Sequence, residues 1–299
     1  MAQIEQRLPE NVEGEFYVDE SCIDCDACRQ IAPAAFRDHG GQSSVYRQPR
    51  NPSELRLALM AQVACPTASI GTVSRHSSRE GVQAFPTPVV DNVYFCGFTS
   101  ASSYGAWSYL IVRPAERGGN VLVDSPRFTS PLVKRIEQMG GVNLMFLSHR
   151  DDIADHAQFA AHFRCPRVMH AGDGAARLGI EQVISGEQVV RIDDSLLIIP
   201  TPGHTRGHQV LLYRDQVLFT GDHLAWSPKR ETLTAFRDVC WDSWTDQTRS
   251  MEKLLAYRFE WVLPGHGRIG HASADAMQEH LRQCVAGMKS RDERMMRHQ

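Results

Sequence analysis

The sequence predicts an α+β protein built from two modules, and three observations indicate this organisation. The chain has 299 residues, of which 42% are hydrophobic and 22% charged, so it is long enough to form two buried cores. Cysteines gather at residues 22–28, with a further one at Cys65. From residue 89 onward, short apolar runs alternate with helical patterns, which is typical of mixed sheets flanked by helices.

The boundary between the modules is expected in a polar stretch that contains glycine and two prolines. Residues 74–88 show no periodic apolar pattern, as is common in connections between domains. We therefore expect a first domain over residues 1–80, a linker over 81–88 and a second domain over 89–299.

Composition narrows the classes of partner and compartment. The net charge of -3 gives no reason to expect nucleic acid, and no apolar run reaches the roughly 18 residues that span a bilayer. The N-terminus has no apolar region of a signal peptide, so we expect a cytoplasmic protein. Residues 5–26 hold eight acids and one base, which we interpret either as a docking face for a redox partner or as an ordinary solvated surface.

The first module carries a cysteine pattern that indicates an iron–sulfur cluster. Cys22, Cys25 and Cys28 form a C-x2-C-x2-C run, and Cys65 follows 37 residues after Cys28, directly before proline. Soft thiolates at this spacing can each reach one corner of a cubane. Eight cysteines in a chain without an export signal also argue against a disulfide framework.

Residues 14–73 resemble a single-cluster, bacterial-type ferredoxin. The resemblance implies one [4Fe–4S] cluster held by these four cysteines. In two-cluster ferredoxins the triple run continues to a fourth cysteine before proline, but here that position is Ala32, before Pro33. A zinc knuckle or unpaired thiols are the alternatives, although a structural zinc site more usually pairs two short hooks.

Regular elements are expected throughout both modules. In the first, residues 16–19 read as a strand and 54–64 as a helix. In the second, the strands are expected at residues 92–96, 108–112, 120–123, 144–147, 167–169, 196–199, 210–213, 217–220 and 261–263. The helices are expected at residues 131–139, 155–163, 246–257 and 272–289.

Four of these strands are followed within five residues by histidine or aspartate. The residues that follow them, in chain order, are His149, His204, Asp222 and His266. Glycines beside three of them allow sharp backbone turns that put the side chain at the rim of a sheet. Imidazole and carboxylate groups released at several strand ends are how a metal site is commonly built.

At these residues the second module resembles a metallo-β-lactamase-fold protein, close in pattern to glyoxalase II. The resemblance covers residues 89–271 and implies an αββα sandwich with two metals at one sheet edge. It implies His149, His204 and one further residue of the opening stretch for the first metal. For the second metal it implies Asp155, His156 and His266, with Asp222 as a bridge. The catalytic residues that it implies are Asp222, His204 and Asp155.

The stretch from His149 to His156 departs from that family's first motif. It is two residues longer than His-x-His-x-Asp-His, and the second histidine is absent. Asp151 stands at the same offset from His149 and is our first choice as substitute, and Asp152 is the second. Flavodiiron proteins, a redox branch of this fold, also carry an acid here. A carboxylate shifts preference from zinc toward iron or manganese, so we expect one or two divalent ions of these kinds.

Several further residues have weaker functional interpretations. His208 is expected to pack beneath the ligand loop rather than to bind metal. Trp226 and Phe236 are candidates for a pocket wall. Arg206, Lys229 and Arg230 could hold an anionic substrate, although solvated basic side chains are the usual situation.

Three functions follow from the two modules. The first is a hydrolase of a small ester, thioester or lactone with an attached [4Fe–4S] electron-transfer domain. The second is a ferredoxin-fed di-iron oxidoreductase that reduces oxygen, nitric oxide or a peroxide, since a plain hydrolase needs no electron carrier. The third is a non-catalytic redox sensor or binding protein. The expected partners are a small-molecule substrate and a redox protein at the acidic face, without nucleic acid or membrane, and a homodimer is compatible with the sequence.

Overall fold

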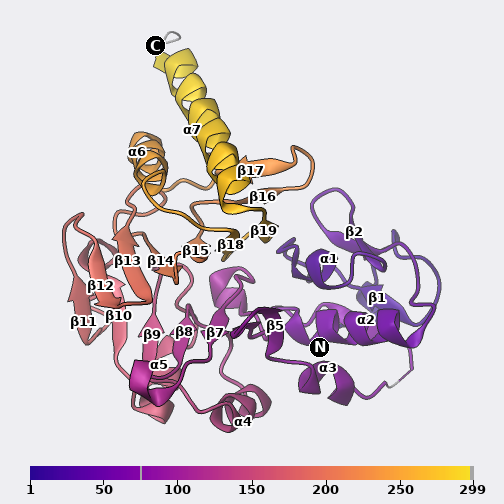
Figure 1. Cartoon of the computed structure of the whole chain (residues 1–299). Helices are drawn as coiled ribbons and strands as arrows, with labels where there is room; N and C mark the ends of the chain where they lie inside the picture. Colours follow the sequence, from indigo (N-terminus) through magenta and orange to yellow (C-terminus); the bar gives the residue numbers. More distant parts are fainter. Residues whose placement is uncertain (75, 297–299) are drawn as a thin grey trace. The chain divides into compact units, whose positions relative to one another are not determined.

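The structure is a computed structural model that describes residues 1–74 and 76–296, with side chains described as far as residue 290 (Figure 1). The chain forms two compact units. One comprises Met1–Asn143 with Ala154–Phe163, and the other comprises Leu144–Ile153 with Arg164–Gln299. Among the described residues, no helix is both long and apolar enough to cross a membrane.

The first unit begins with a small layer of strands and helices around the cysteines. Antiparallel pairing joins β1 to β4, with Val18 opposite Ile70, and joins β2 to β3. These elements are β1 (Phe16–Val18), α1 (Ala27–Ile31), β2 (Phe36–Asp38), β3 (Ser43–Val45), α2 (Pro52–Ala64) and β4 (Ile70–Thr72). The side chains of Phe16, Phe36 and Leu59 are buried in a common core.

Helix α2 has clear start and stop signals in the sequence. Asn51 precedes it, and the Asn51 side chain accepts a hydrogen bond from the Glu54 backbone N–H, a cap worth about 1 kcal/mol. Pro52 occupies the first helical position, where a missing N–H has no cost. The expected helix at 54–64 is thus confirmed and begins two residues earlier.

The rest of the first unit is an antiparallel sheet with helices. Its strands pair in the order β5 (Thr87–Val90), β6 (Val93–Phe95), β7 (Tyr109–Ile111) and β8 (Val121–Val123). Its helices are α3 (Arg79–Gln83), α4 (Ser130–Gln138) and α5 (His156–Phe163). The residues expected to form a linker therefore include the end of α3 and the start of β5.

The second unit contains two groups of paired strands. Three strands pair in parallel: β9 (Leu144–Phe146), β10 (Arg167–His170) and β11 (Gln182–Ile184). Six strands form a mixed sheet in the order β12 (Val190–Asp193), β13 (Leu196–Pro200), β14 (Gln209–Tyr213), β15 (Val217–Gly221), β18 (Trp261–Pro264) and β19 (Gly270–His271). The strands expected at 196–199, 210–213, 217–220 and 261–263 are all present.

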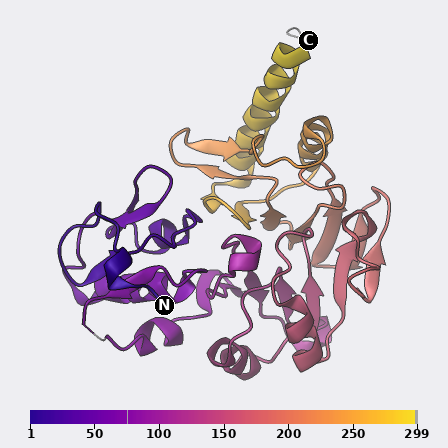
Figure 2. The same cartoon turned by 180° about the vertical axis from the view of Figure 1, so that it is seen from behind.

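Two helices and a hairpin complete the second unit. Side chains of α6 (Trp244–Leu254) and α7 (Ala274–Met296), such as Met251 and Leu281, share a core with Leu218 and Val262 of the mixed sheet. The hairpin of β16 (Ala225–Ser227) and β17 (Thr232–Thr234) lies beside α7 in both views (Figures 1 and 2). It was not expected from the sequence.

The pairing of the mixed sheet brings distant residues to one edge. Strands β15 and β18 are parallel, with Gly221 opposite Pro264, so the residues that follow both strands emerge together. Strand β14 is antiparallel to β15, and Gln209 of β14 pairs with Pro200 of β13. The loop 201–208 therefore opens at the same edge as Asp222 and His266.

Candidate metal centre

The four cysteines of the first module line one small cavity. Cys28 lies in α1, Cys22 and Cys25 lie in the loop before it, and Cys65 directly follows α2. Asp24 and Asp26 have φ values of 59° and 65°, so the loop winds tightly between the cysteines. The cavity wall is otherwise mainly apolar and includes Val18, Ile23 and Ile70.

The electrostatics of this cavity suit a metal cluster. Burial raises the pKa of Cys25 to about 12 and raises that of Cys28 further, so these thiols do not ionise near neutral pH without a nearby cation. Backbone N–H groups point at two of the sulfurs, from Ser43 to Cys22 Sγ at 3.4 Å and from Ser69 to Cys65 Sγ at 3.3 Å. Iron ions would stabilise the thiolates, and the N–H groups would donate to them.

Residues that follow β6 contact the end of α2 and the cysteine loop, which together form this cavity. The last carbonyls of α2 have no partner within the helix. Thr99 Oγ1 donates to Ala64 O at 2.6 Å, and Arg127 Nη2 donates to Val63 O at 3.3 Å. Gly105 lies so close to the cysteine loop that a Cβ there would be 2.6 Å from Cys25 Cβ. The cysteine cavity is therefore built against residues 97–127 of the same compact unit.

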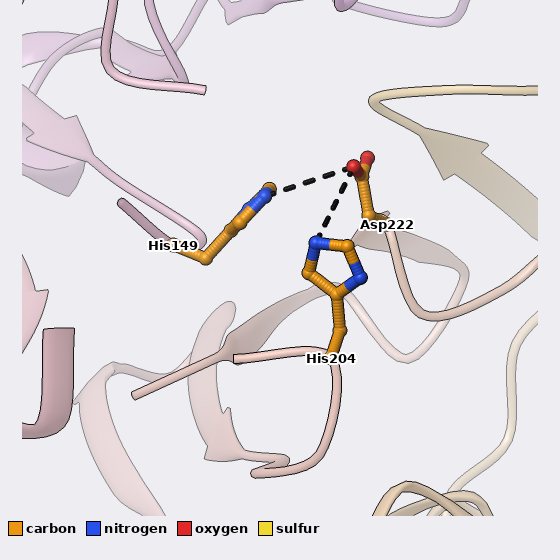
Figure 3. A group of neighbouring side chains, drawn as sticks. All are labelled: His149, His204 and Asp222. Atoms are coloured by element: carbon orange, nitrogen blue, oxygen red, sulfur yellow. Dashed lines mark ion pairs between the residues drawn. The ribbon is translucent and has the colours of Figure 1, made fainter. Parts of the chain in front are cut away.

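The second candidate site is a cluster of histidines and aspartates in the other unit. His149 follows β9, His204 lies in the loop after β13, and Asp222 follows β15. Figure 3 shows the two imidazole rings directed at the Asp222 carboxylate. Asp222 Oδ2 is 3.7 Å from His149 Nε2 and 3.6 Å from His204 Nε2.

Asp151 completes this first group. Its Oδ2 atom is 3.8 Å from His149 Nε2 and 3.7 Å from His204 Nε2. The nearby His204 and His149 rings lower the pKa of the Asp151 carboxyl, which keeps it ionised. Asp151 therefore lies where the resemblance calls for a fourth side chain, next to His149, His204 and Asp222. Its role as a ligand stays a prediction.

Asp152 and His266 form an adjoining group with Asp222. His266 Nε2 is 3.9 Å from Asp152 Oδ1 and 3.9 Å from Asp222 Oδ2. Gly265 allows this approach, because a Cβ there would be 2.3 Å from Asp152 Oδ2 and 2.9 Å from Asp222 Oδ1. The two groups share Asp222, so this carboxylate is placed to contact two ions at once. The sequence suggested Asp152 only as a substitute in the first group.

Asp155 and His156, the expected ligands of the second metal, lie in the first compact unit. Asp155 Oδ2 accepts a hydrogen bond from the Phe128 backbone N–H at 2.7 Å. Its carbonyl accepts from Phe159 N, which starts α5, and His156 is the buried first residue of that helix. Within the second unit the structure brings together His149, Asp151, Asp152, His204, Asp222 and His266.

The charge state of the site is suited to a cation. Burial lowers the pKa of His149 to about 4, so this ring is neutral at pH 7. Its Nδ1 is hydrogen-bonded to Ser148 Oγ at 3.0 Å, which leaves Nε2 facing the carboxylate. His149 Nε2, His204 Nε2 and Asp222 Oδ1 are buried and have no hydrogen-bond partner within the described part of the chain. A neutral imidazole nitrogen and a carboxylate that face each other both offer electron pairs, and a divalent ion between them would satisfy both.

Two buried histidines accept hydrogen bonds from the backbone of candidate ligands. His208 Nε2 accepts a hydrogen bond from the Asp222 backbone N–H, and His223 Nε2 accepts one from the His204 backbone N–H, both at 3.3 Å. Burial holds the pKa of each well below its usual value, so both rings are neutral acceptors. His208 thus packs beneath the ligand loop, as expected.

Asp173 ties two ligand loops together and was missed by sequence reasoning. Its buried carboxylate accepts hydrogen bonds from Arg150 N at 2.9 Å, Thr205 Oγ1 at 2.7 Å and Gly207 N at 2.7 Å. The first belongs to the 149–152 stretch and the other two belong to the loop after His204. The only local signal was a Gly-Asp-Gly turn, which carries no information about distant partners.

Comparison with known proteins identifies the first module. Residues 18–72 match the family described as the 4Fe-4S single cluster domain of Ferredoxin I. The expected single-cluster ferredoxin domain is therefore confirmed, with the cysteines lining one cavity.

The second module is similar to hydroxyacylglutathione hydrolases. The chain is 29% identical to that of Acidiphilium cryptum over 114 residues, which cover 37% of this chain and 46% of the relative. It is 27% identical to that of Rhodospirillum rubrum over 138 residues, or 44% of this chain and 54% of the relative. The chain thus spans about half the length of the curated relatives it matches.

Solved structures establish the fold of the second module. The DIM-1 metallo-β-lactamase aligns with a TM-score of 0.50 and 18% identity, over 67% of this chain and 95% of that one. The metallo-β-lactamase of Hirschia baltica aligns with a TM-score of 0.51 and 14% identity, over 67% and 96% respectively. The expected fold class, a [4Fe–4S] ferredoxin-type domain followed by a metallo-β-lactamase fold, is confirmed.

Proposed function

We propose that the protein is a metal-dependent hydrolase that acts on a small ester, thioester or lactone. The observation that carries this proposal is the pair of ligand groups that share Asp222. One group holds His149, Asp151 and His204, and the other holds Asp152 and His266. The similarity to hydroxyacylglutathione hydrolases supports the same reaction class.

The side chains at this site are proposed to have different catalytic roles. Divalent ions held here would polarise a carbonyl and make hydroxide available near neutral pH. His149 offers a neutral nitrogen, and His208 and His223 accept the backbone hydrogen bonds that orient Asp222 and His204. Asp222 fixes the spacing of the two groups, since its carboxylate belongs to both. Asp155, an expected catalytic residue, belongs to the first unit and accepts a hydrogen bond from Phe128 N there.

The donor set also favours a second candidate, a di-iron oxidoreductase fed by the ferredoxin domain. Asp151, Asp152 and Asp222 supply three carboxylates beside three imidazoles, and oxygen-rich sites prefer iron or manganese to zinc. Such an enzyme would reduce oxygen, nitric oxide or a peroxide with electrons from the cluster.

For the oxidoreductase, we also propose a redox partner protein that binds the acidic N-terminal face, residues 5–26. Several of its eight acids are engaged internally: Asp19 is buried, Asp24 and Asp26 pair with Arg29, and Glu15 accepts a hydrogen bond from Ser74 N. Exposed acids such as Glu13 and Glu20 are left to face a partner. A basic partner protein should therefore bind more weakly as salt is raised.

The deciding experiment measures metals and turnover in the full chain. The protein is purified without oxygen, its metal and sulfide contents are determined, and ester, thioester and lactone panels are assayed. Zinc or iron beyond the cluster, with turnover of one panel, is the expected result. Two further irons that are reoxidised by oxygen or nitric oxide, without hydrolysis, would favour the oxidoreductase. A protein with no metal beyond the four cluster irons would overturn both candidates.

A further inference from the structure

Residues 235–242 join β17 to α6 and run from one ligand loop to another. Near the start, the Phe236 ring packs on Gly267, where a Cβ would be 3.2 Å from Phe236 Cζ. Gly267 directly follows His266. Near the end, the Trp241 ring lies edge-on to His204, with ring centroids 6.3 Å apart. The segment therefore forms a rim along both ligand groups.

Backbone contacts hold the end of this rim in place. The N–H groups of Trp241 and Asp242 both donate to His204 O, at 2.9 and 3.2 Å. Gly203 O accepts from Ser243 N at 2.9 Å and from Cys240 Sγ at 3.2 Å. Trp241 is thus tied to the loop that carries His204 and is positioned by it.

The rim presents apolar surface to solvent. Trp241 is 60% exposed and Val239 is 39% exposed, although both are large hydrophobic side chains. Exposed indole surface gains about 25 cal/mol for each Å² that a ligand covers. An exposed aromatic ring beside a metal-ligand loop is therefore well suited to hold an apolar group of a substrate.

The charged groups of the rim do not favour an anionic ligand. The Arg237 guanidinium stacks over Trp244 at 5.4 Å. Arg206 lines a groove together with Asp242 and Glu187, so its charge is offset there. The charged residue next to Trp241 in the chain is an acid, Asp242.

We propose that residues 235–242 are the substrate-recognition rim and that Trp241 binds an apolar chain or ring of the substrate. This inference rests on the proposed hydrolase function and narrows its substrate class. The preferred substrate is an ester or thioester with an apolar group of several carbons, and acetyl esters of small polar alcohols are poor substrates.

The first test compares chain-length selectivity in the metal-loaded full chain. Two substrate series are assayed with wild type, Trp241→Ala, Trp241→Phe and a control, Ile192→Ala. Ile192 is an exposed apolar residue on β12. One series varies the acyl chain and the other varies the thiol. In wild type kcat/KM should rise with chain length in one series, which identifies the side of the substrate that Trp241 holds. Trp241→Ala should reduce the ratio of long-chain to short-chain kcat/KM by roughly tenfold, and Trp241→Phe should restore most of it.

The second test is independent of turnover. Octanoate and acetate, products of the acyl series, are titrated calorimetrically into the same four proteins. Octanoate should bind more tightly than acetate to wild type and Ile192→Ala, and this preference should fall in Trp241→Ala. If no substrate is hydrolysed but the tighter binding of octanoate over acetate depends on Trp241, the hydrolase proposal fails. The proposal that Trp241 binds apolar groups is then retained. If Trp241→Ala changes neither chain-length selectivity nor octanoate binding, the rim proposal is overturned.

Discussion

Asp151 and Asp152 are neighbours in the sequence but face different ligand groups. Asp151 lies with His149 and His204, whereas Asp152 lies with His266, and Asp222 contacts both sets. Adjacent side chains can diverge in this way when the backbone turns between them. Asp152 is almost fully buried, while the Asp151 side chain is 44% exposed, which is consistent with an inner and an outer position.

This division predicts separate losses of metal. Asp151→Ala should lower occupancy of the group with His149 and His204, and Asp152→Ala should lower that of the group with His266. Asp222→Ala should empty both, since the shared carboxylate is removed. Metal per chain beyond the cluster irons, measured by mass spectrometry, should fall by about one ion in Asp151→Ala and in Asp152→Ala, and by about two in Asp222→Ala. Asp194→Ala, an exposed acid after β12, is the control. Full occupancy in Asp152→Ala would contradict the assignment.

Asp173 is expected to contribute to stability and to metal affinity, although it is not one of the candidate ligands. Asp173→Ala removes the acceptor for Arg150 N, Thr205 Oγ1 and Gly207 N, and it leaves Thr205 Oγ1 and Gly207 N buried. The free energy of unfolding should fall by about 1–3 kcal/mol. Metal affinity should also fall, because two ligand loops lose their common anchor. Urea unfolding and metal competition with a chelator measure the two effects. Unchanged metal affinity with lowered stability would show that Asp173 is only structural.

At the scale of elements, the loop between β6 and β7 connects the cysteine cavity to the sheet of the same unit. Gly105 in this loop has φ +84° and leaves no room for a side chain beside Cys25 and Pro66. Thr99 and Arg127 cap the end of α2, which directly precedes Cys65. Two of the four cysteines are therefore positioned by residues outside the ferredoxin motif.

Gly105→Ala should consequently impair cluster binding. Its Cβ would come 2.9 Å from Cys25 Sγ, so the cysteine loop must move. We expect less iron and sulfide per chain and faster bleaching of the cluster absorbance in air. Gly118→Ala is a matched control, because Gly118 has φ +81° and its Cβ would approach Arg113 Nη2, at 2.9 Å, rather than a cysteine. Equal cluster content in the two variants would refute this role of Gly105.

At the scale of the whole molecule, the cluster is expected to stabilise more than its own module. The thiols of Cys25 and Cys28 have pKa values raised by burial, so a chain without the cluster keeps them as unpaired buried thiols. Iron ligation adds folding free energy at this point, as metal sites in small domains usually do. Because residues 97–127 contact the cavity, part of that stabilisation should extend to them.

Cys65→Ser tests this coupling. The variant should lack the cluster, and hydrogen exchange of residues 97–107 should become faster than in wild type. Exchange in β13, β14 and β15 should stay protected, since these strands belong to the other compact unit. Cys165→Ser, at a buried cysteine outside the cavity, should leave both cluster and exchange unchanged. Identical exchange at residues 97–107 in Cys65→Ser and wild type would rule out the coupling.

Motif chemistry could be predicted from the sequence because it is local. Three cysteines within seven residues, and histidine or aspartate directly after an apolar strand, indicate ligand types without knowledge of the fold. Parallel pairing of β15 with β18 then brings Asp222 and His266 together, as the strand pattern suggested. The hairpin of β16 and β17 was not foreseen, because its residues show no strong alternation.

By itself, the sequence determined the cysteine cluster motif, the two fold classes and the histidine and aspartate types of the second site. Only the tertiary structure decided which carboxylate faces which group. No pattern in residues 150–154 encodes their backbone path, which includes Ala154 at φ +28°. The Asp173 anchor and the Trp241 rim likewise arise from contacts between residues more than 20 positions apart, which tertiary packing alone brings together.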